Sequence, residues 1–589
     1  MNDELTVTAG SDRGSLAHTQ ARPCEDRAGL IRAAFITLAL AQIVLLSVLG
    51  LGCTVGPDYR RPDLPMPAEW SSLQADAAAT QPASAPASPK PFAERHPDPL
   101  WQAQGPTTRP TSRPCDIGSW WRKLNDPTLD SLIDRAVQSN LDLKIATARV
   151  REARAQRNSV AAGLWPQIGA AGSYNYGGGS LNAGREASGG TGLGKQVRNT
   201  AVNSAVQSLV NGQGIDPAQI ASNAAKQALS TAVNNKLSDE GRVSHRGQNV
   251  FQAGFDASWE LDVFGGVRRG LEAADAEVVA SVEDQRAVIV SLVAEVALEY
   301  VQLRGYQRRL AIAHKNIEAQ RKTVELTQDR RSVGFTNDLE VAQARTQLAT
   351  TTSQVPVLQD SVRQTMYRLS ILLGLPPGAL VPELEEASAI PTSPPEVPIG
   401  LPSELLRRRP DVSSAERQLA AATARIGEAI ADLFPKFSIT GSFGTQSRDI
   451  RYMLDRDSLV WSLGPAVSWP IFQGGRIRAN IEIQNARQEQ ALAAYEQTVL
   501  NALNEVEAAL SAYLNEQIRR QALLEAVETS RQATELSTRL YVRGLGAFLN
   551  VLEAQRSLYA TEEALVQSDT AIITDLIALY KALGGGWEG

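Results

Sequence analysis

Histidine and cysteine are scarce in this chain, and their scarcity argues against several kinds of site. Only 4 of the 589 residues are histidine and 3 are cysteine, and neither type recurs at the spacing of metal ligands. The sequence also has no glycine-rich phosphate loop, no nucleophile elbow and no group of carboxylates around a histidine. We therefore expect no enzyme activity, no catalytic residues, no metal site and no cofactor.

An excess of basic residues is also lacking, since 58 Lys and Arg stand against 64 Asp and Glu, for a net charge of −6. Proteins that bind nucleic acid present a basic surface, so nucleic acid is not an expected partner. Aromatic residues make up only 5%, whereas alanine, leucine, glutamine, glutamate and arginine dominate the middle and the end, as in long helices and coiled coils. A chain of 589 residues therefore predicts several domains or one very elongated structure.

One long apolar run, "AAFITLALAQIVLLSVLGLG", follows Arg27 and Arg32 and ends directly before Cys53. It is long enough to be a transmembrane helix, but basic residues followed by an apolar stretch and a small residue also describe a secretory signal. We favour the second interpretation, because "LGLGCTVGPDYRRP" resembles a bacterial lipoprotein signal. Residues 1–52 are then the signal peptide and Cys53 is the lipidated first residue. Loss of Cys24 would leave Cys115 without an intramolecular disulfide partner.

Residues 53–118 are rich in proline, alanine, serine and threonine. They lack the apolar periodicity that would compensate the entropy of ordering. We expect an N-terminal tether here.

The sequence contains an internal repeat. "RSVGFTNDLEVAQARTQL" from Arg331 returns as "YVRGLGAFLNVLEAQRSL" from Tyr541, and repeats are to be sought before a fold is assigned. Matching residues lie 210 apart at Gly334 and Gly544 and at Leu339 and Leu549, and 269 apart at Asp142 and Asp411 and at Pro166 and Pro435. We assign residues 119–375 to the first repeat, 376–402 to an equatorial linker and 403–589 to the second repeat.

Four segments alternate apolar and polar residues, which is the period of a β-strand. They are "QIGAAGSYNY", "VFQAGFDASW", "FSITGSFG" and "WSLGPAVSW", and an insert at residues 177–248 separates the first two. About ten alternating residues with aromatic ends are typical of a transmembrane strand, although a strand of a soluble sandwich has the same pattern. The export signal favours the membrane. Four strands leave open edges that lipid does not tolerate, so several chains must pool their hairpins.

Long helices follow each hairpin. From Arg476 to Arg543 there is no glycine or proline, which predicts a rod of about 100 Å with apolar residues at coiled-coil spacing. Gly334 and Gly544 end the two long helices as left-handed caps, and Asn337 with Glu340 resembles a capping box. Shorter helices return over about residues 339–373, interrupted by Pro356, and 548–583. We expect two further short helices, one from "WWRKL" to "LWP" and its counterpart ending at "LFP". Each should stack end to end with a return helix.

Together these motifs resemble the outer-membrane factor family, the TolC-like and NodT-type channel lipoproteins of efflux pumps. The resemblance is carried by "CTVGPDYRRP", "NDPTLDSLI", "NLDLKIATARVREARA", "ELDVFGG", "LPSELLRRRPDV", "FPKFSITGSFG", "WPIFQGGRIRANI" and "GLGAFLNVLEAQRSL". It implies a mixed fold, with a membrane β-barrel and a long α-helical barrel. Four β-strands from each chain of a homotrimer would make a twelve-stranded barrel, with coiled-coil helices in the periplasm.

The family's function would be passive conduction from periplasm to exterior as the outer-membrane channel of a tripartite efflux system, including multidrug export. The implied partners are a periplasmic adaptor (membrane fusion) protein, an inner-membrane efflux transporter and outer-membrane lipid. The protein would be lipid-anchored in the outer membrane and extend into the periplasm. Two alternatives stay open on the sequence: a duct for type I protein secretion, and a periplasmic coiled-coil scaffold.

The resemblance also implies a periplasmic aperture, narrowed by side chains at the tip of the second repeat. Carried over by motif, these are Leu549, Asn550 and Glu553, with Arg556 as a tether. Three copies of Glu553 would favour cations, as charged rings do in pores. In the first repeat we expect Asp338 and Glu340 to be solvated.

Overall fold

The computed structural model describes residues 54–62, 67, 70, 109–111, 117–177, 247–392, 396–398, 402–403 and 408–587. The chain divides into two units, Met1–Cys53 and Thr54–Gly589, and every described residue belongs to the second. The predicted signal peptide, Cys53, most of the tether and nearly all of the 177–248 insert therefore lie outside the described residues.

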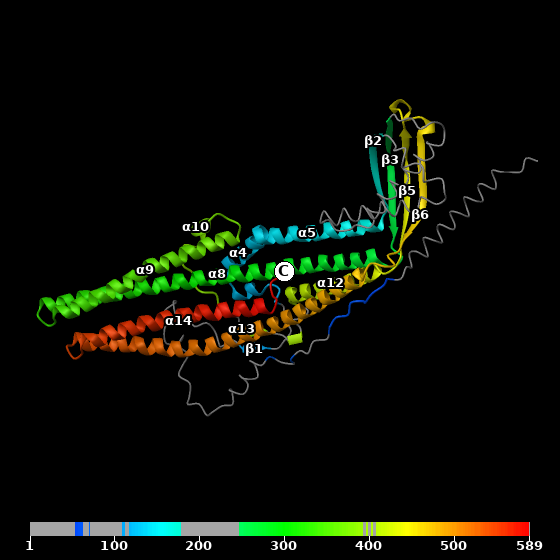
Figure 1. The fold of residues 1–589 in the computed structure, drawn as a ribbon. Coiled ribbons are helices and arrows are strands. Elements are labelled where there is room, and N and C mark those ends of the chain that lie inside the picture. Colours follow the sequence, from blue (N-terminus) through cyan, green and yellow to red (C-terminus); the bar gives the residue numbers. More distant parts are fainter. Residues whose placement is uncertain are drawn as a thin grey trace, which may run out of the picture. The chain divides into compact units, whose positions relative to one another are not determined.

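A four-stranded antiparallel sheet contains all four predicted strands (Figure 1). The strands are β2 (Gln167–Gly177), β3 (Gln248–Leu261), β5 (Lys436–Ser447) and β6 (Leu459–Ser468), in the order β2-β3-β5-β6. Two short 3-10 turns, η4 (Ile450–Tyr452) and η5 (Arg456–Ser458), join β5 to β6. Among the described strands, β2 and β6 have only one neighbour each, so the sheet has two open edges.

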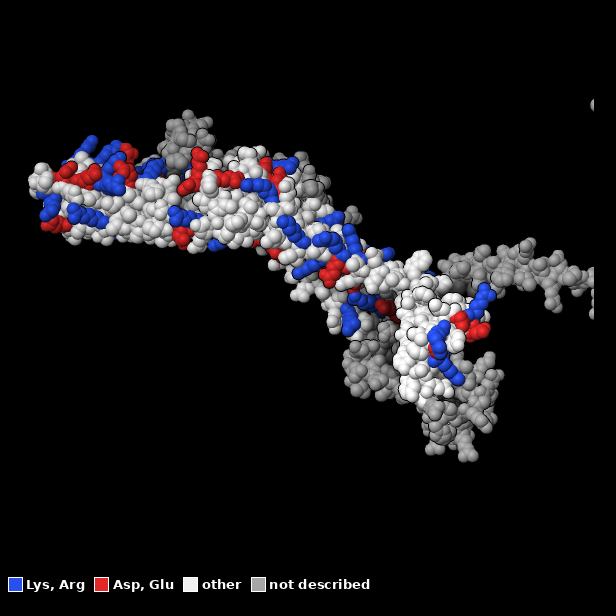
Figure 2. Space-filling view, turned by 90° about the horizontal axis from the view of Figure 1, so that it is seen from above, with Lys and Arg blue, Asp and Glu red and all other residues white. Residues whose placement is uncertain are grey.

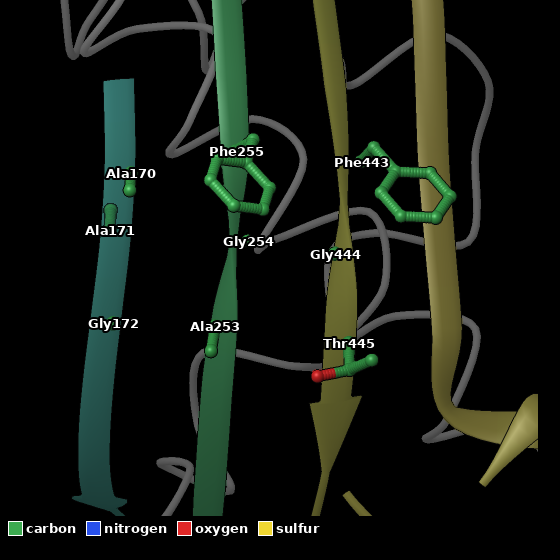
Figure 3. Close-up of a pocket in the computed structure, with 9 residues that line it drawn as sticks. All are labelled: Ala170, Ala171, Gly172, Ala253, Gly254, Phe255, Phe443, Gly444 and Thr445. Atoms are coloured by element: carbon green, nitrogen blue, oxygen red, sulfur yellow. The ribbon is translucent and has the colours of Figure 1, made fainter. Parts of the chain in front are cut away.

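Small residues lie side by side in the middle of this sheet, where Gly254 of β3 pairs with Gly444 of β5. A Cβ atom on Gly254 would lie 2.8 Å from the Cα atom of Gly444, so glycine permits this close approach of the two backbones. The next pair, Phe255 and Phe443, lies on the opposite face. An open hollow of about 410 Å³ lies at these residues (Figure 3), lined mostly by glycine, alanine and phenylalanine, with Thr445 as the one polar side chain in its lining.

Two long helices begin directly below the sheet: α8 (Gly266–Ser332) and α13 (Arg476–Val542), each of 67 residues. This length corresponds to about 100 Å, as predicted for the stretch without glycine or proline. Each is followed by a return helix of 35 residues, α9 (Asp338–Leu372) or α14 (Phe548–Ala582). In Figure 1 each return helix runs back along its long helix, and α8 also contacts α14.

Pro356 does not interrupt α9, so that expectation was wrong. Proline removes one backbone hydrogen bond from a helix. Pro356 is exposed, so water can reach the carbonyl that loses its partner, and the packing of α9 along α8 holds the helix on both sides of it.

The helix predicted from "WWRKL" to "LWP" is also interrupted. It consists of η2 (Trp120–Leu124), α4 (Pro127–Ser139), α5 (Leu141–Ala161) and η3 (Ala162–Leu164). Asn140 separates α4 from α5 with a non-helical backbone (φ −55°, ψ 138°), and its side chain accepts a hydrogen bond from the Leu143 amide at 3.0 Å. This capping interaction competes with continuous helix. The counterpart is α12 (Pro410–Ala431).

The main apolar core lies where these helices meet midway along α8. Trp120 stacks on Tyr580 with 5.2 Å between ring centroids, and the Tyr300 hydroxyl donates to Asp126 at 2.7 Å. Leu384 of α10 (Val381–Leu384) also belongs to this core. Buried leucine, isoleucine and valine side chains from α4, α8 and α14 fill it. Elsewhere β1 (Arg109–Thr111) and β4 (Glu396–Pro398) form a parallel pair.

Charges of both signs are interspersed over the helices (Figure 2). Within the described ranges, none of the helices combines the length and the apolar character needed to cross a bilayer.

Candidate functional site at the helix tips

The two helical hairpins turn with the same backbone geometry. Gly334 has φ 80° and Gly544 has φ 74°, and the next residue's amide bonds back to the carbonyl five positions earlier, Phe335 to Arg330 and Leu545 to Leu540, both at 2.9 Å. This is the Schellman arrangement that ends many helices. A Cβ atom at either glycine would meet nothing within 4 Å. The left-handed backbone, not lack of space, therefore selects glycine at both predicted tip turns.

The return helices begin differently. Asn337 caps α9 by accepting from the Glu340 amide at 3.2 Å, whereas Ala547 at the start of α14 gives no side-chain cap. The Glu340 carboxylate does not complete the predicted capping box. It accepts from the hydroxyl groups of Thr336 and Tyr541 instead.

Tyr541 and Glu340 join the two hairpins at the tip. The Tyr541 hydroxyl, on α13, donates to Glu340 Oε2, on α9, at 2.6 Å. Glu340 is half-buried, so the expectation that it is solvated was wrong. Burial raises the pKa of Tyr541 to about 12, and the hydrogen bond to Glu340 adds to the shift. Asp338 is exposed, as expected, and pairs with Arg331 at 2.6 Å.

Arg330 covers the other side of Tyr541. Its guanidinium carbon lies 4.6 Å from the centroid of the Tyr541 ring, within the range of a cation–π contact. Nη1 donates to the Val542 carbonyl at 3.1 Å, where a cation also interacts favourably with the C-terminal end of α13. Arg330, from α8, therefore adds a second polar link between the hairpins.

An apolar cluster backs these polar contacts. It contains Val324 and Ala344 from the first hairpin and four residues of the second, Tyr541, Phe548, Val551 and Leu552. All six are buried. The two tips consequently pack as one unit.

The candidate aperture residues lie on α14 outside the buried face that Phe548, Val551 and Leu552 form. Leu549, Asn550, Glu553 and Arg556 are all exposed, and the first of these is 50% exposed. Spacings of four and three place Leu549, Glu553 and Arg556 in one stripe. Arg556 Nε donates to Gln347 Oε1 on α9 at 2.6 Å, so this residue also links the two return helices.

Further polar contacts between the hairpins follow above the tip. Gln555 donates to Thr323 at 2.9 Å, Glu563 pairs with Arg309 at 2.5 Å, and Glu562, which is 4% exposed, accepts from Asn316 at 3.5 Å. Glu562 also accepts from Arg531 at 2.9 Å within the second hairpin. Such contacts can exchange for water when two helices separate. These polar contacts can therefore hold the second hairpin, α13 and α14, against the first, α8 and α9, or let the two separate.

Tyr541 and Arg330 were not identified as site residues from the sequence. The partner of Tyr541 is Glu340, 201 positions away, and the partner of Arg330 is Val542, 212 positions away. The sequence did offer one indication. Tyr541 is the first residue of the second copy of the repeated motif, and the equivalent residue of the first copy is Arg331.

Comparison with protein families identifies the class of protein. The model of the "Outer membrane efflux protein" family matches residues 132–375 and 401–585, which together make up well over half of the chain. The chain belongs to this family, a class of transport proteins.

Characterised relatives match most of the chain. It is 32% identical over 469 residues to the pyoverdine export outer membrane protein OpmQ of Pseudomonas putida, covering 80% of this chain and 88% of the relative. It is 28% identical over 542 residues to nodulation protein T of Rhizobium leguminosarum bv. trifolii, covering 92% and 96%. The cation efflux system protein CusC of Escherichia coli O157:H7 is 28% identical, with 91% and 96% covered.

Solved structures agree. The outer-membrane channel OprN superimposes with a TM-score of 0.71 at 32% identity, covering 91% of this chain and 100% of that one. The open state of the Neisseria gonorrhoeae MtrE outer membrane channel gives a TM-score of 0.66 at 25% identity, with 91% and 99% covered. The protein is thus an outer-membrane efflux channel, as the sequence predicts, and not a coiled-coil scaffold.

Proposed function

We propose that three copies of the chain form the conducting unit, with a twelve-stranded β-barrel in the outer membrane above a helical barrel in the periplasm. The open edges of β2 and β6 support association, because unpaired strand edges are not tolerated in lipid. Two internal repeats, recognisable in the equal lengths of α8 and α13 and of α9 and α14, would give the helical barrel six similar hairpins.

The duct narrows at the helix tips. In a ring of three copies, Leu549, Asn550 and Glu553 project from the exposed face of α14 into the periplasmic mouth. The observation that carries this assignment is that all three are exposed, whereas Phe548 and Leu552 beside them are buried against the first hairpin. Carboxylates brought together in such a ring attract cations and repel anions.

The inter-hairpin contacts hold this mouth narrow. Tyr541 with Glu340 and Arg556 with Gln347 keep α13 and α14 against α8 and α9. Opening would require α14 to move outward and exchange these hydrogen bonds for water. A periplasmic adaptor that binds the tips can supply the free energy for that exchange, and an inner-membrane transporter then drives substrate into the duct.

Lipidation of Cys53 would anchor the chain at the membrane. The adjoining residues support this proposal, because the Val55 amide donates to the Phe264 carbonyl at 3.2 Å in the link between β3 and α8. The relatives' names refer to pyoverdine, cations, antibiotics and toluene, so the exported substrate is chosen outside this fold, by the inner-membrane transporter.

The test is the reversal potential of the purified protein in a planar bilayer under a KCl gradient, with mass measurement of the detergent complex. We expect a trimer that prefers cations, and a loss of preference in Glu553→Gln. Glu385→Gln, an exposed glutamate far from the tip, is the matched control. A trimer whose selectivity is unchanged by Glu553→Gln would contradict the aperture assignment, and a non-conducting monomer would contradict the whole proposal.

A further inference from the structure

The buried residues of the two helical hairpins change from apolar to polar some distance above the tips. The apolar cluster at the tips, which includes Val324 and Phe548, is followed by a level at which no apolar side chain is buried. This holds for residues 314–323, 345–357, 528–540 and 553–564, all of which the structure describes. The buried side chains at this level form a polar belt: Gln320 on α8, Gln347 and Thr351 on α9, and Glu562 on α14.

The belt residues lie at similar heights above the two tip turns. Gln320 and Gln347 are 14 and 13 positions from Gly334 (334 − 320 and 347 − 334), and Glu562 is 18 positions from Gly544 (562 − 544). At a rise of about 1.5 Å per residue, these separations place the belt about 20–27 Å above the tips. Apolar side chains are buried again above the belt, at Ile312, Leu358 and Leu565.

The polar atoms of the belt are incompletely paired. Gln320 is 3% exposed, and its Oε1 atom has no hydrogen-bond partner among the described residues. Gln347 donates to Thr351 at 3.5 Å, and Asn316 donates to Glu562 at the same distance. Hydrogen bonds of this length are weak, and a buried polar atom without a partner destabilises the packed state. The belt therefore holds the hairpins together less firmly than the apolar clusters below and above it.

The return helix α9 is weakened at the same level. Pro356 has no amide hydrogen, so the Thr352 carbonyl lacks its helical hydrogen bond. The hydroxyl groups of Thr350 and Thr352 donate to the carbonyls four positions earlier, at 2.9 and 2.7 Å, and such bonds favour bending of a helix. α9 can consequently bend between the tip cluster and the apolar core above the belt.

We propose that the polar belt is the upper limit of channel opening. Below the belt, α13 and α14 separate from α8 and α9, whereas above it the hairpins stay packed. Separation through the belt exposes no buried apolar side chain, but separation beyond it would expose the core that begins at Leu358 and Leu565. The inference rests on the proposed opening by separation of the hairpins, and adds to it the level at which the separation ends.

Apolar side chains in the belt test this inference in the full-length protein. Gln320→Leu/Thr351→Val would join the tip cluster to the core above, and is introduced into the wild type and into Tyr541→Phe/Arg556→Ala, which lacks two links between the hairpins. In the latter, we expect the single-channel conductance to return to the wild-type value. Amide exchange at residues 548–558 should slow about tenfold, as expected for burial of one more apolar side chain.

A matched control makes the same kinds of change on the exposed side of α9. Thr352→Val/Gln354→Leu should leave conductance and amide exchange unchanged, because both side chains are exposed. Native mass measurement establishes that each variant is assembled. Gln320→Leu alone, which removes the unpaired oxygen, replaces the double change if that variant does not assemble.

Position-resolved amide exchange shows where the separation ends. In Tyr541→Phe/Arg556→Ala, exchange along α14 should accelerate from Phe548 to Glu562 and stay unchanged from Leu565 onward. Acceleration beyond Leu565, or a conductance that the apolar belt does not lower, would overturn the belt as the limit while leaving the proposed opening intact. If Tyr541→Phe/Arg556→Ala changed neither conductance nor exchange, the proposed opening would be overturned, and the inference with it.

Discussion

Asn140 and Arg409 lie 269 positions apart and make the same connection in the two halves of the chain. Asn140 caps α5 and donates from Nδ2 to the Leu372 carbonyl at the end of α9, at 2.8 Å. Arg409 precedes α12 and donates from Nη1 to the Ala582 carbonyl at the end of α14, at 2.7 Å. Each side chain thus joins the end of a return helix to the beginning of the short helix that continues its line, as the predicted end-to-end stacking requires.

Arg409→Ala should destabilise the protein more than Asn140→Ala. Arg409 is 7% exposed and also pairs with Asp411 at 2.6 Å and Glu505 at 2.7 Å, so its removal leaves a carbonyl and two carboxylates without their partner. We expect a loss of about 2 kcal/mol, against about 1 kcal/mol for Asn140→Ala. Thermal unfolding in detergent measures both. Equal effects, or an effect as small as that of Arg321→Ala on the exposed face of α8, would contradict this role.

Tyr541→Phe should loosen the tips without disturbing the apolar cluster. The substitution keeps the ring against Phe548 and Arg330 but removes the hydroxyl that donates to Glu340. A hydrogen bond to a charged group contributes about 1.5–3 kcal/mol, so amide exchange at the start of α14 should accelerate roughly tenfold or more. The exposed Tyr367→Phe is the control. Unchanged exchange at α14 would show that the hydroxyl does not restrain the second hairpin.

Gly544→Ala should strain the second tip turn. The left-handed backbone at φ 74° costs a side chain about 1 kcal/mol or more. Asparagine tolerates this conformation better than alanine, so Gly544→Asn should recover part of the loss in thermal stability. If alanine and asparagine were equivalent at this position, the backbone argument would be wrong.

Asp575 should make stability depend on pH. Burial, with a smaller contribution from Glu516, raises the pKa of Asp575 to about 6 from the ordinary 3.8. The folded state therefore favours the protonated form of Asp575. Ionisation of Asp575 does not lower the stability of the folded protein below pH 3.8, lowers it increasingly between pH 4 and 6, and lowers it by the full amount above pH 6. Asp575→Asn should raise the melting temperature near pH 7.5 and change it little near pH 4. Asp360→Asn, on the exposed face of α9, should show no such difference.

Local patterns predicted the elements well. The alternation in "VFQAGFDASW" and "FSITGSFG" predicted strands whose ends lie within a few residues of those of β3 and β5. The stretch without glycine or proline predicted α13. Errors arose where one side chain competes with the helix. Asn140 can either continue a helix or cap the next one, and its contact with the Leu372 carbonyl at the end of α9, a tertiary contact, favours the cap.

Contacts between distant segments could not be predicted in the same way. Leu549 and Glu553 are exposed, and their role at an aperture stays a prediction. The partner of Glu340 could not be foreseen. Asn337 and Glu340 have the spacing of a capping box. The carboxylate turns to Tyr541 because packing of α13 against α9 brings a phenol within reach, and that packing is set by the tertiary fold.

We propose that separation of the two hairpins opens the duct, and single-channel conductance measures this opening. Wild-type protein and the double variant Tyr541→Phe/Arg556→Ala would be compared in the same planar bilayer. We expect a small conductance for wild type and a several-fold larger one for the variant, because two of the polar links between the hairpins, Tyr541 with Glu340 and Arg556 with Gln347, are lost. Equal conductance, with the variant folded and trimeric, would contradict the account.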